Sequence, residues 1–181
     1  MNVGSKRSHV CKAIPFHGKF SLHGLPMGPK QIRPMEIHFK SFQELTNDEL
    51  YQALRLRSAV FVVEQDCVYQ DMDNKDQRAI HLLAMEKDRV LAYTRIFRPG
   101  DYFDNASIGR VVVEGSQRMH GFGKQIMLAS LAWIRELYPD SGIEISAQSY
   151  LVPFYMGLGF KGVGTEYLED GIPHCRMVIK N

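Results

Sequence analysis

The sequence predicts one α/β domain with a mixed, mostly antiparallel central sheet of six to seven strands and helices on both faces. The chain of 181 residues has the length of a single domain, and its hydrophobic content of 45% is enough for a core. Apolar residues alternate in several short runs, as in strands, and recur at helical spacing in longer segments. Because these two kinds of run are interspersed along the chain, the helices are expected to pack against a sheet.

The first predicted elements are a strand and a helix. Apolar and polar residues alternate over residues 36–42, which predicts a strand. Residues 46–49 form a capping box, which predicts the start of a helix that ends near residues 58–60. The run 60–65 is rich in β-branched residues and fits either a strand or a buried helix end. Residues 66–77 carry four aspartates and predict a loop.

The central part of the chain predicts a hairpin, a strand and a long helix. Residues 79–85 and 89–97 are alternating runs separated by three polar residues, which indicates a β-hairpin. Residues 107–113 predict the next strand. From Gly121 to Leu137 the apolar face is so wide that it predicts a helix buried against the sheet.

Short elements complete the chain. Residues 143–147 predict a strand, and residues 149–158 predict a short helix that ends at Gly159, a natural C-terminal glycine. Two last strands, residues 163–168 and 174–179, are separated by a turn.

Residues 1–34 differ in composition from the rest. They are rich in Gly, Pro, Lys, His and Ser and lack the apolar region of a secretory signal. We interpret them as an upstream extension that is not native to the protein or as a flexible arm, in preference to a transit peptide. The rest of the chain holds 16 of the 22 basic residues and all 20 acidic ones, which argues against a nucleic-acid-binding face. No run approaches the roughly 18 apolar residues of a membrane span.

The three cysteines are Cys11, Cys67 and Cys175. Their number is odd, and their spacing fits neither a zinc site nor a disulfide framework. We interpret them as reduced thiols in a reducing compartment such as the cytoplasm. No metal is expected.

The stretch from Ile108 to Leu137 carries the main functional signal. A predicted strand leads into Arg118-Met-His-Gly121-Phe-Gly123 and then into the long helix. Backbone N–H groups at a helix start lack intrahelical partners, the helix dipole is positive there, and glycines let an anion approach the backbone. The spacing matches neither a dinucleotide fingerprint nor a P-loop. The loop therefore predicts an anion site with many possible ligands.

A second motif narrows this prediction. Phe154-Tyr-Met-Gly-Leu-Gly-Phe160 follows the next predicted strand, and together with Arg118-x-x-Gly121-x-Gly123 it resembles the GCN5-related N-acetyltransferase (GNAT) superfamily. Residues 54–71, the strand 108–113 and Glu169-Asp-Gly-Ile-Pro-His174 resemble its ElaA-type bacterial branch. The resemblance implies an acyl-CoA N-acyltransferase fold over residues 35–181, with acetyl-CoA as the acyl donor.

The resemblance also implies which residues serve the coenzyme. The end of the central strand would pair with the pantetheine arm, one of its N–H groups would polarise the thioester carbonyl, and the glycine loop would bind the pyrophosphate. Gln148 stands where many members carry an Asn that contacts pantetheine, and Tyr155 would protonate the departing thiolate. The implied coenzyme-binding residues are Val111, Val112, Val113, Arg118, Met119, His120, Gly121, Phe122, Gly123, Lys124 and Gln148.

The general base is left open at this point. Glu114, directly after the coenzyme strand, is a candidate for the base, with Glu64, His81 or a relayed water as alternatives. Asp170 and His174 lie in a turn that could border the acceptor site, although the hydrogen bonds of a turn also explain them.

Three functions fit these observations. The leading one is transfer of an acetyl group from acetyl-CoA to a primary amine, in a small molecule or a peptide, by direct attack in a ternary complex. The second is acyl transfer from a carrier protein, because residues 54–64 faintly resemble acyl-homoserine-lactone synthases; the acidic body argues against it. The third is a non-catalytic coenzyme A-binding module. Neither a nucleic-acid nor a membrane partner is expected, and the sequence does not decide whether the chain forms a homodimer.

Overall fold

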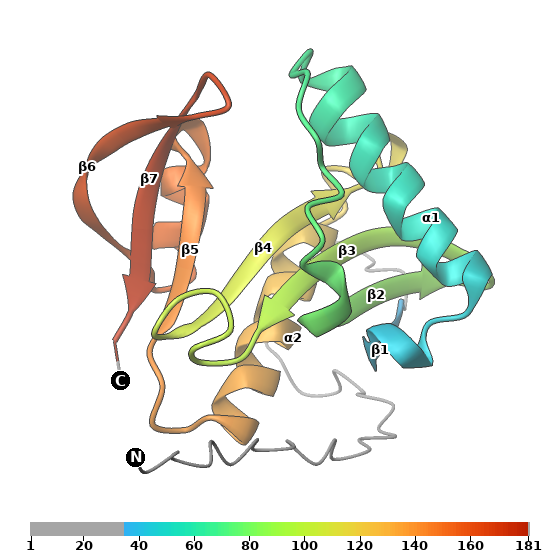
Figure 1. Ribbon diagram of the computed structural model, residues 1–181, viewed down its shortest axis with the longest axis horizontal. Coiled ribbons are helices and arrows are strands. Elements are labelled where there is room, and N and C mark those ends of the chain that lie inside the picture. The colour runs from blue at the N-terminus through green and yellow to red at the C-terminus, as the bar shows by residue number, and fades with distance from the viewer. Residues whose placement is uncertain (1–34, 181) are drawn as a thin grey trace, which may run out of the picture.

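A seven-stranded sheet forms the centre of the computed structural model, which describes residues 35–180 (Figure 1). The strand order is β1-β2-β3-β4-β5-β7-β6, and only the β4–β5 pair is parallel. The strands are β1 (Glu36–Ser41), β2 (Ile80–Glu86), β3 (Arg89–Phe97), β4 (Ala106–Val113), β5 (Ile143–Gln148), β6 (Lys161–Glu169) and β7 (Ile172–Ile179). The predicted mixed, mostly antiparallel sheet is confirmed.

The two longer helices cover opposite faces of the sheet (Figure 1). On one face, α1 (Asn47–Arg57) packs against a core cluster that includes Leu83, Tyr93 and Val112. On the other face, α2 (Phe122–Leu137) buries its apolar side in the larger cluster. The predicted capping box is present at the start of α1, where the Thr46 hydroxyl accepts from the Glu49 N–H at 3.2 Å. Between residues 35 and 180, no helix combines the length and apolar character needed to cross a bilayer.

The helix after the capping box is longer than its regular α-helical part. A π-helix, η2 (Ser58–Glu64), continues directly from α1, so the undecided run 60–65 is helical rather than a strand. Its β-branched residues are tolerated because it is anchored by α1 and by the bond from the Gln65 N–H to the Val60 carbonyl (3.1 Å). Single-turn π segments of this kind occur often at functional sites.

The chain between α2 and the last strands also differs in detail from expectation. The predicted helix 149–158 is a 3-10 turn, η5 (Ser149–Leu151), followed by α3 (Val152–Met156), and Gly159 follows with φ +95°. The final hairpin turn is tighter than predicted, because Asp170 (φ +50°) and Gly171 (φ +79°) alone reverse the chain and β7 begins at Ile172.

β4 and β5 separate soon after they begin. Their ladder contains only Ala106 opposite Ile143 and Ser107 opposite Glu144. On its other side, β4 has a β-bulge against β3 at Arg110, whose φ is +51°. The rest of β4 therefore has a free backbone edge toward β5. The candidate site lies in the gap between these two strands.

Candidate active site

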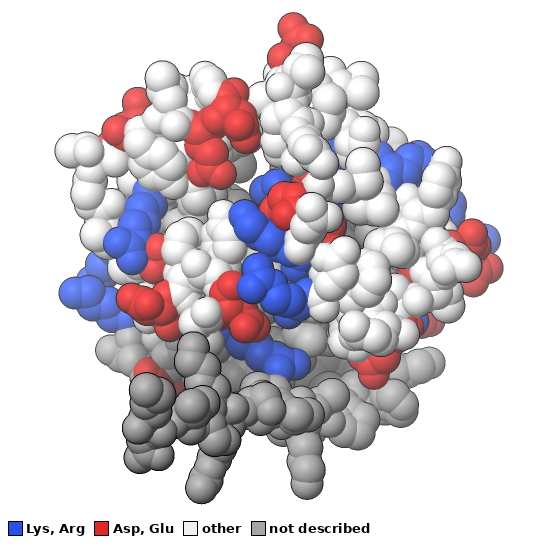
Figure 2. Space-filling model, in the orientation of Figure 1, with Lys and Arg blue, Asp and Glu red and all other residues white. Residues whose placement is uncertain are grey.

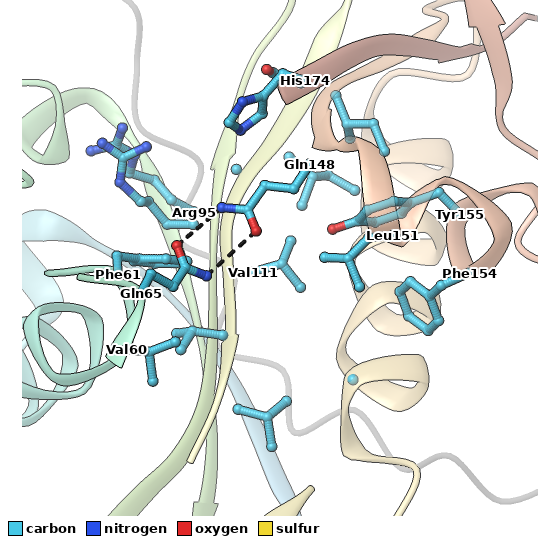
Figure 3. Close-up of a pocket in the computed structure, with 18 of the residues that line it drawn as sticks. Val60, Phe61, Gln65, Arg95, Val111, Gln148, Leu151, Phe154, Tyr155 and His174 are labelled. Carbon is cyan, nitrogen blue, oxygen red and sulfur yellow. Dashed lines mark hydrogen bonds between the residues drawn. The ribbon is translucent and has the colours of Figure 1, made fainter. Parts of the chain in front are cut away.

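A cavity of about 700 Å³ occupies the gap between β4 and β5. Its walls come from η2, β4, the start of α2, the β5–α3 segment and the β6–β7 turn. Figure 3 shows side chains from these separate elements pointing toward one space. Elements far apart in the sequence thus meet in one cavity, large enough for a ligand of drug size.

The glycine loop borders this cavity at the N-terminus of α2. Gly121 is the N-cap residue and has φ +79°, a left-handed conformation that favours glycine, so the loop needs glycine here. An added Cβ at Gly123 would lie 3.8 Å from Val113 and 4.0 Å from Phe154, in ordinary contact. His120 does not line the cavity; its ring lies 3.2 Å from the Gln117 carbonyl. The loop residues that do line it are Arg118, Met119, Gly121, Phe122, Gly123 and Lys124.

Arg118 already has an anionic partner. Its two terminal nitrogens donate to both carboxylate oxygens of Glu64 at 2.6 and 2.8 Å. These hydrogen bonds raise the pKa of Arg118 and lower the pKa of Glu64. Both side chains are largely exposed, so a phosphate can compete for the guanidinium at low cost.

Val111, Val112 and Val113 line the cavity along the free edge of β4. Val112 points to the α1 face and is buried with Tyr93, whereas Val111 and Val113 pack against the α2 cluster. Since β5 does not pair with these residues, their backbone groups on that side can bind an extended ligand in the manner of an added strand.

A pair of glutamine side chains crosses the cavity. The Gln148 amide at the end of β5 donates to Gln65 Oε1 at 3.0 Å, and the Gln65 amide donates to Gln148 Oε1 at 3.4 Å (Figure 3). Next to this pair, the Cys67 thiol lies 3.4 Å from the Asp170 carbonyl. Residues 64–67 therefore contact the glycine loop, the end of β5 and the β6–β7 turn.

Tyr155 forms part of the wall opposite this pair. Its side chain is 5% exposed, and its ring packs edge-on between Phe154 and Phe160, with centroids 5.1 and 5.9 Å away. Figure 3 shows its hydroxyl pointing into the cavity. Burial raises the pKa of Tyr155 above its ordinary value, so the phenol stays protonated. Such a group can donate a proton to a leaving group.

A buried ionic network supports the α1 side of the cavity. Asp71 accepts from Arg57 Nε at 2.8 Å and from Arg110 Nε at 2.6 Å, so it joins α1 to the bulge of β4. Asp76 accepts from Arg57 (2.8 Å) and Arg95 (3.0 Å). These two aspartates of the predicted acidic loop are therefore paired with arginines. Arg57 at helical spacing with apolar residues was the only sequence signal for this network.

The comparison with known families agrees with this geometry. A family model described as an acetyltransferase (GNAT) domain matches residues 43–181. The chain belongs to the GNAT acetyltransferase family.

Protein ElaA from Escherichia coli (strain K12) is 41% identical over 136 residues, which make up 74% of this chain and 89% of ElaA. The crystal structure of Escherichia coli ElaA superposes with a TM-score of 0.75 at 38% identity, covering 80% of this chain and 99% of that one. An acyl-CoA N-acyltransferase from Pseudomonas aeruginosa gives a TM-score of 0.76 at 39% identity with the same coverage. The family and fold are therefore those of acyltransferases.

Two of the sequence-based candidates for the general base of this GNAT domain lie outside the cavity lining. Glu114 pairs with Arg89 at 2.9 Å on the far side of β4. His81 is 1% exposed and bonded on both ring nitrogens, to the Tyr93 hydroxyl (2.8 Å) and the Asp76 carbonyl (3.0 Å), and burial lowers its pKa.

Three other ionisable side chains do line the cavity, at the β6–β7 hairpin: Glu169, Asp170 and His174. In the sequence, these three residues stood out only as part of the motif Glu169–His174, which resembles the ElaA-type branch. Among the described residues, no group of three or more His, Cys, Asp and Glu side chains could hold a metal ion, and Cys67 and Cys175 are free thiols.

Proposed function

We propose that this protein transfers an acetyl group from acetyl-CoA to a primary amine by direct attack in a ternary complex. The observation that carries the proposal is one cavity bordered by a helix N-terminus, the free edge of β4 and the buried Tyr155 phenol. These three features supply an anion site, a strand-like binding edge and a proton donor.

In the proposed complex, the pyrophosphate binds the backbone N–H groups of residues 119–124, and Lys124 and Arg118 add positive charge. Arg118 exchanges Glu64 for phosphate. The pantetheine arm lies along Val111–Val113, which requires the Gln65–Gln148 pair to part and frees the Gln148 amide to bind the arm. One N–H group of β4 polarises the thioester carbonyl, as in other oxyanion sites.

Thiolate departure is assisted by Tyr155. A phenol has an ordinary pKa of about 10 and a thiol about 8.5, so the transfer is driven only weakly and its benefit comes from position. Attack by the amine on the thioester is direct, because neither Cys67 nor Cys175 has a hydrogen bond with a histidine or carboxylate side chain among residues 35–180 that would activate it as a nucleophile.

The acceptor is proposed to be a primary amine in a small molecule or peptide, and the compartment the cytoplasm, where the free thiols of Cys67 and Cys175 stay reduced. A carrier-protein donor is less well supported, because the glycine loop provides a binding site for the pyrophosphate of free coenzyme A. A coenzyme-binding module without activity would leave the buried Tyr155 phenol unexplained.

Isothermal titration of the full chain with acetyl-CoA tests the first step. We expect saturable binding that phosphopantetheine alone reproduces only weakly, since it lacks the pyrophosphate. Absence of acetyl-CoA binding would refute the proposal. Binding without release of coenzyme A in the presence of any primary amine would favour the non-catalytic module.

A further inference from the structure

We infer that His174 is the general base that takes the proton from the acceptor amine. The inference rests on the proposed function, since it assigns the acceptor half of the same reaction. An amine is protonated near neutral pH and must lose a proton before it attacks a thioester, so a base with a free lone pair has to face the cavity. Figure 3 shows the His174 ring pointing into the cavity beside Gln148.

Within the described residues 35–180, the hydrogen bonding of His174 leaves one ring nitrogen without a partner. Nδ1 lies 2.8 Å from the Ile172 carbonyl oxygen, which can only accept, so Nδ1 carries the hydrogen. In the neutral imidazole, Nε2 then holds the lone pair. The Tyr167 ring stacks on the imidazole with an interplanar angle of 27° and a centroid distance of 6.2 Å, which restrains its orientation.

The strand register places His174 beside Gln148, which lies at the end of the proposed path of the pantetheine arm. His174 lies opposite Gln148 in the β5–β7 ladder and opposite Tyr167 in the β6–β7 ladder. Figure 3 shows the His174 ring above the Gln148 side chain and the Tyr155 ring to its right, both directed toward the cavity. An acid and a base thus flank the site at which the pantetheine arm would end.

Other bases of the cavity wall are less suited to this role. Glu64 is held by Arg118, which lowers its pKa. Glu169 accepts from the Ser146 hydroxyl at 2.7 Å and, like Asp170, lies nearer the hairpin tip than His174. Carboxylates are also much weaker bases than an imidazole.

The charged surroundings of the imidazole come from two sides. Tyr167, Glu169 and Asp170 on the hairpin and Cys67 on the opposite wall are titratable groups near it, while Gln148 of β5 adds no charge. The same strands also carry Glu166, Cys175 and Arg176, and Arg176 pairs with Glu144 of β5. Figure 2 shows Asp and Glu side chains gathered at the upper end of the β5–β7 side, where the β6–β7 turn lies, and Lys and Arg side chains lower on that side and along the middle of the face. A cationic amine can therefore approach His174 along the acidic side.

His174 and Tyr155 together account for every proton that moves in the reaction. An ammonium group gives one proton to Nε2 of His174, and the amine nitrogen then bonds to the thioester carbon while the C=O π pair moves to oxygen. That pair returns as the C–S bond breaks, and Tyr155 protonates the thiolate. The nitrogen loses a second proton, which restores the phenol. His174 releases its proton to solvent, so the products are an N-acyl amine, coenzyme A and one proton.

His174→Asn in the full chain tests the assignment, because the Asn amide can still donate to the Ile172 carbonyl but has no basic nitrogen. Coenzyme A release is followed with hexylamine, whose ammonium resembles that of lysine (pKa about 10.4), and with glycinamide, which resembles an α-amino group (about 8). We expect about a 10²-fold loss of kcat/KM with hexylamine, a smaller loss with glycinamide, and partial rescue by imidazole in His174→Ala. Equal losses with both amines and no rescue would make His174 structural and overturn the inference.

Two further measurements separate this inference from the proposed function. Acetyl-CoA affinity should be unchanged in His174→Asn. Diethyl pyrocarbonate, which acylates accessible uncharged imidazoles, should modify His174 and the partly exposed His38 of β1 in the wild type, and acetyl-CoA should slow only the reaction of His174, because His38 lies outside the cavity lining. If neither amine is acetylated, the proposed function fails for these acceptors. Modification of His38 without His174 would refute the present inference whatever the outcome with amines.

Discussion

Replacing Tyr155 by Phe should slow turnover without disturbing the fold. The Tyr155 hydroxyl makes no hydrogen bond within residues 35–180, and the ring is held by Phe154 and Phe160, so Phe retains the packing. Stability should change by no more than about 1 kcal/mol. Loss of the proton donor should lower kcat about 10²-fold, equivalent to about 2.7 kcal/mol in the barrier, because a thiolate is already a fair leaving group.

The assay is coenzyme A release at saturating amine, with acetyl-CoA affinity and thermal unfolding measured on the same preparations. Tyr150→Phe is a matched control, since Tyr150 also borders the cavity but is 69% exposed. Because burial raises the pKa of Tyr155, wild-type kcat should not fall up to pH 9 through ionisation of this phenol. A variant with unchanged kcat, or with kcat and coenzyme affinity reduced equally, would show that Tyr155 is not the acid.

Three other changes probe the site and its support. Glu64→Gln should tighten acetyl-CoA binding about two- to fivefold at low salt by releasing Arg118, with less effect at high salt; weaker binding would mean that Glu64 itself helps the ligand. Arg57→Ala should lower the free energy of unfolding in urea by about 3–5 kcal/mol, because buried Asp71 and Asp76 each lose one of their two arginine partners, whereas the exposed Arg55→Ala should change it little. Burial would raise the pKa of Asp73, but hydrogen bonds from Arg95 outweigh it and hold the pKa at about 2. A carboxyl group whose pKa is lowered by folding stabilises the fold at pH values above its ordinary pKa of about 4. The contribution of Asp73 should therefore disappear as the pH falls from 4 to 2. An Asp73→Asn variant that keeps the full acid dependence would contradict this assignment.

Local patterns predicted most of the fold because each one reports on its own segment. The apolar runs of β2 and β3 and the wide apolar face of α2 indicate buried segments. The structure buries β2 and β3 on both faces, because helices cover both sides of the sheet. The run 60–65 failed to decide between strand and helix, since β-branched residues suit both when buried. Only its continuity with α1 made it helical.

The sequence brings out the parts of the candidate site that lie in contiguous motifs, but not the parts formed by side chains from distant segments. The glycine loop and Tyr155 belong to contiguous motifs. By contrast, Arg57, Asp71 and Arg110 come from α1, a loop and the bulge of β4, and their pairing depends on the three-dimensional arrangement of those segments. The free Nε2 of His174 likewise depends on a hydrogen bond within the turn that the sequence alone does not reveal.

Under the proposed function, the early separation of β4 from β5 would make the coenzyme a part of the folded state. Between Gly109 and Val113 the molecule carries an internal sheet edge that β5 leaves unpaired. A ligand that completes this edge binds the native chain and not the unfolded one. Under the proposed function it would add about 2.7 kcal/mol to the stability at a hundredfold excess over its Kd. The amount of folded protein in a cell would then follow the supply of acyl-coenzyme A as well as the rate of synthesis.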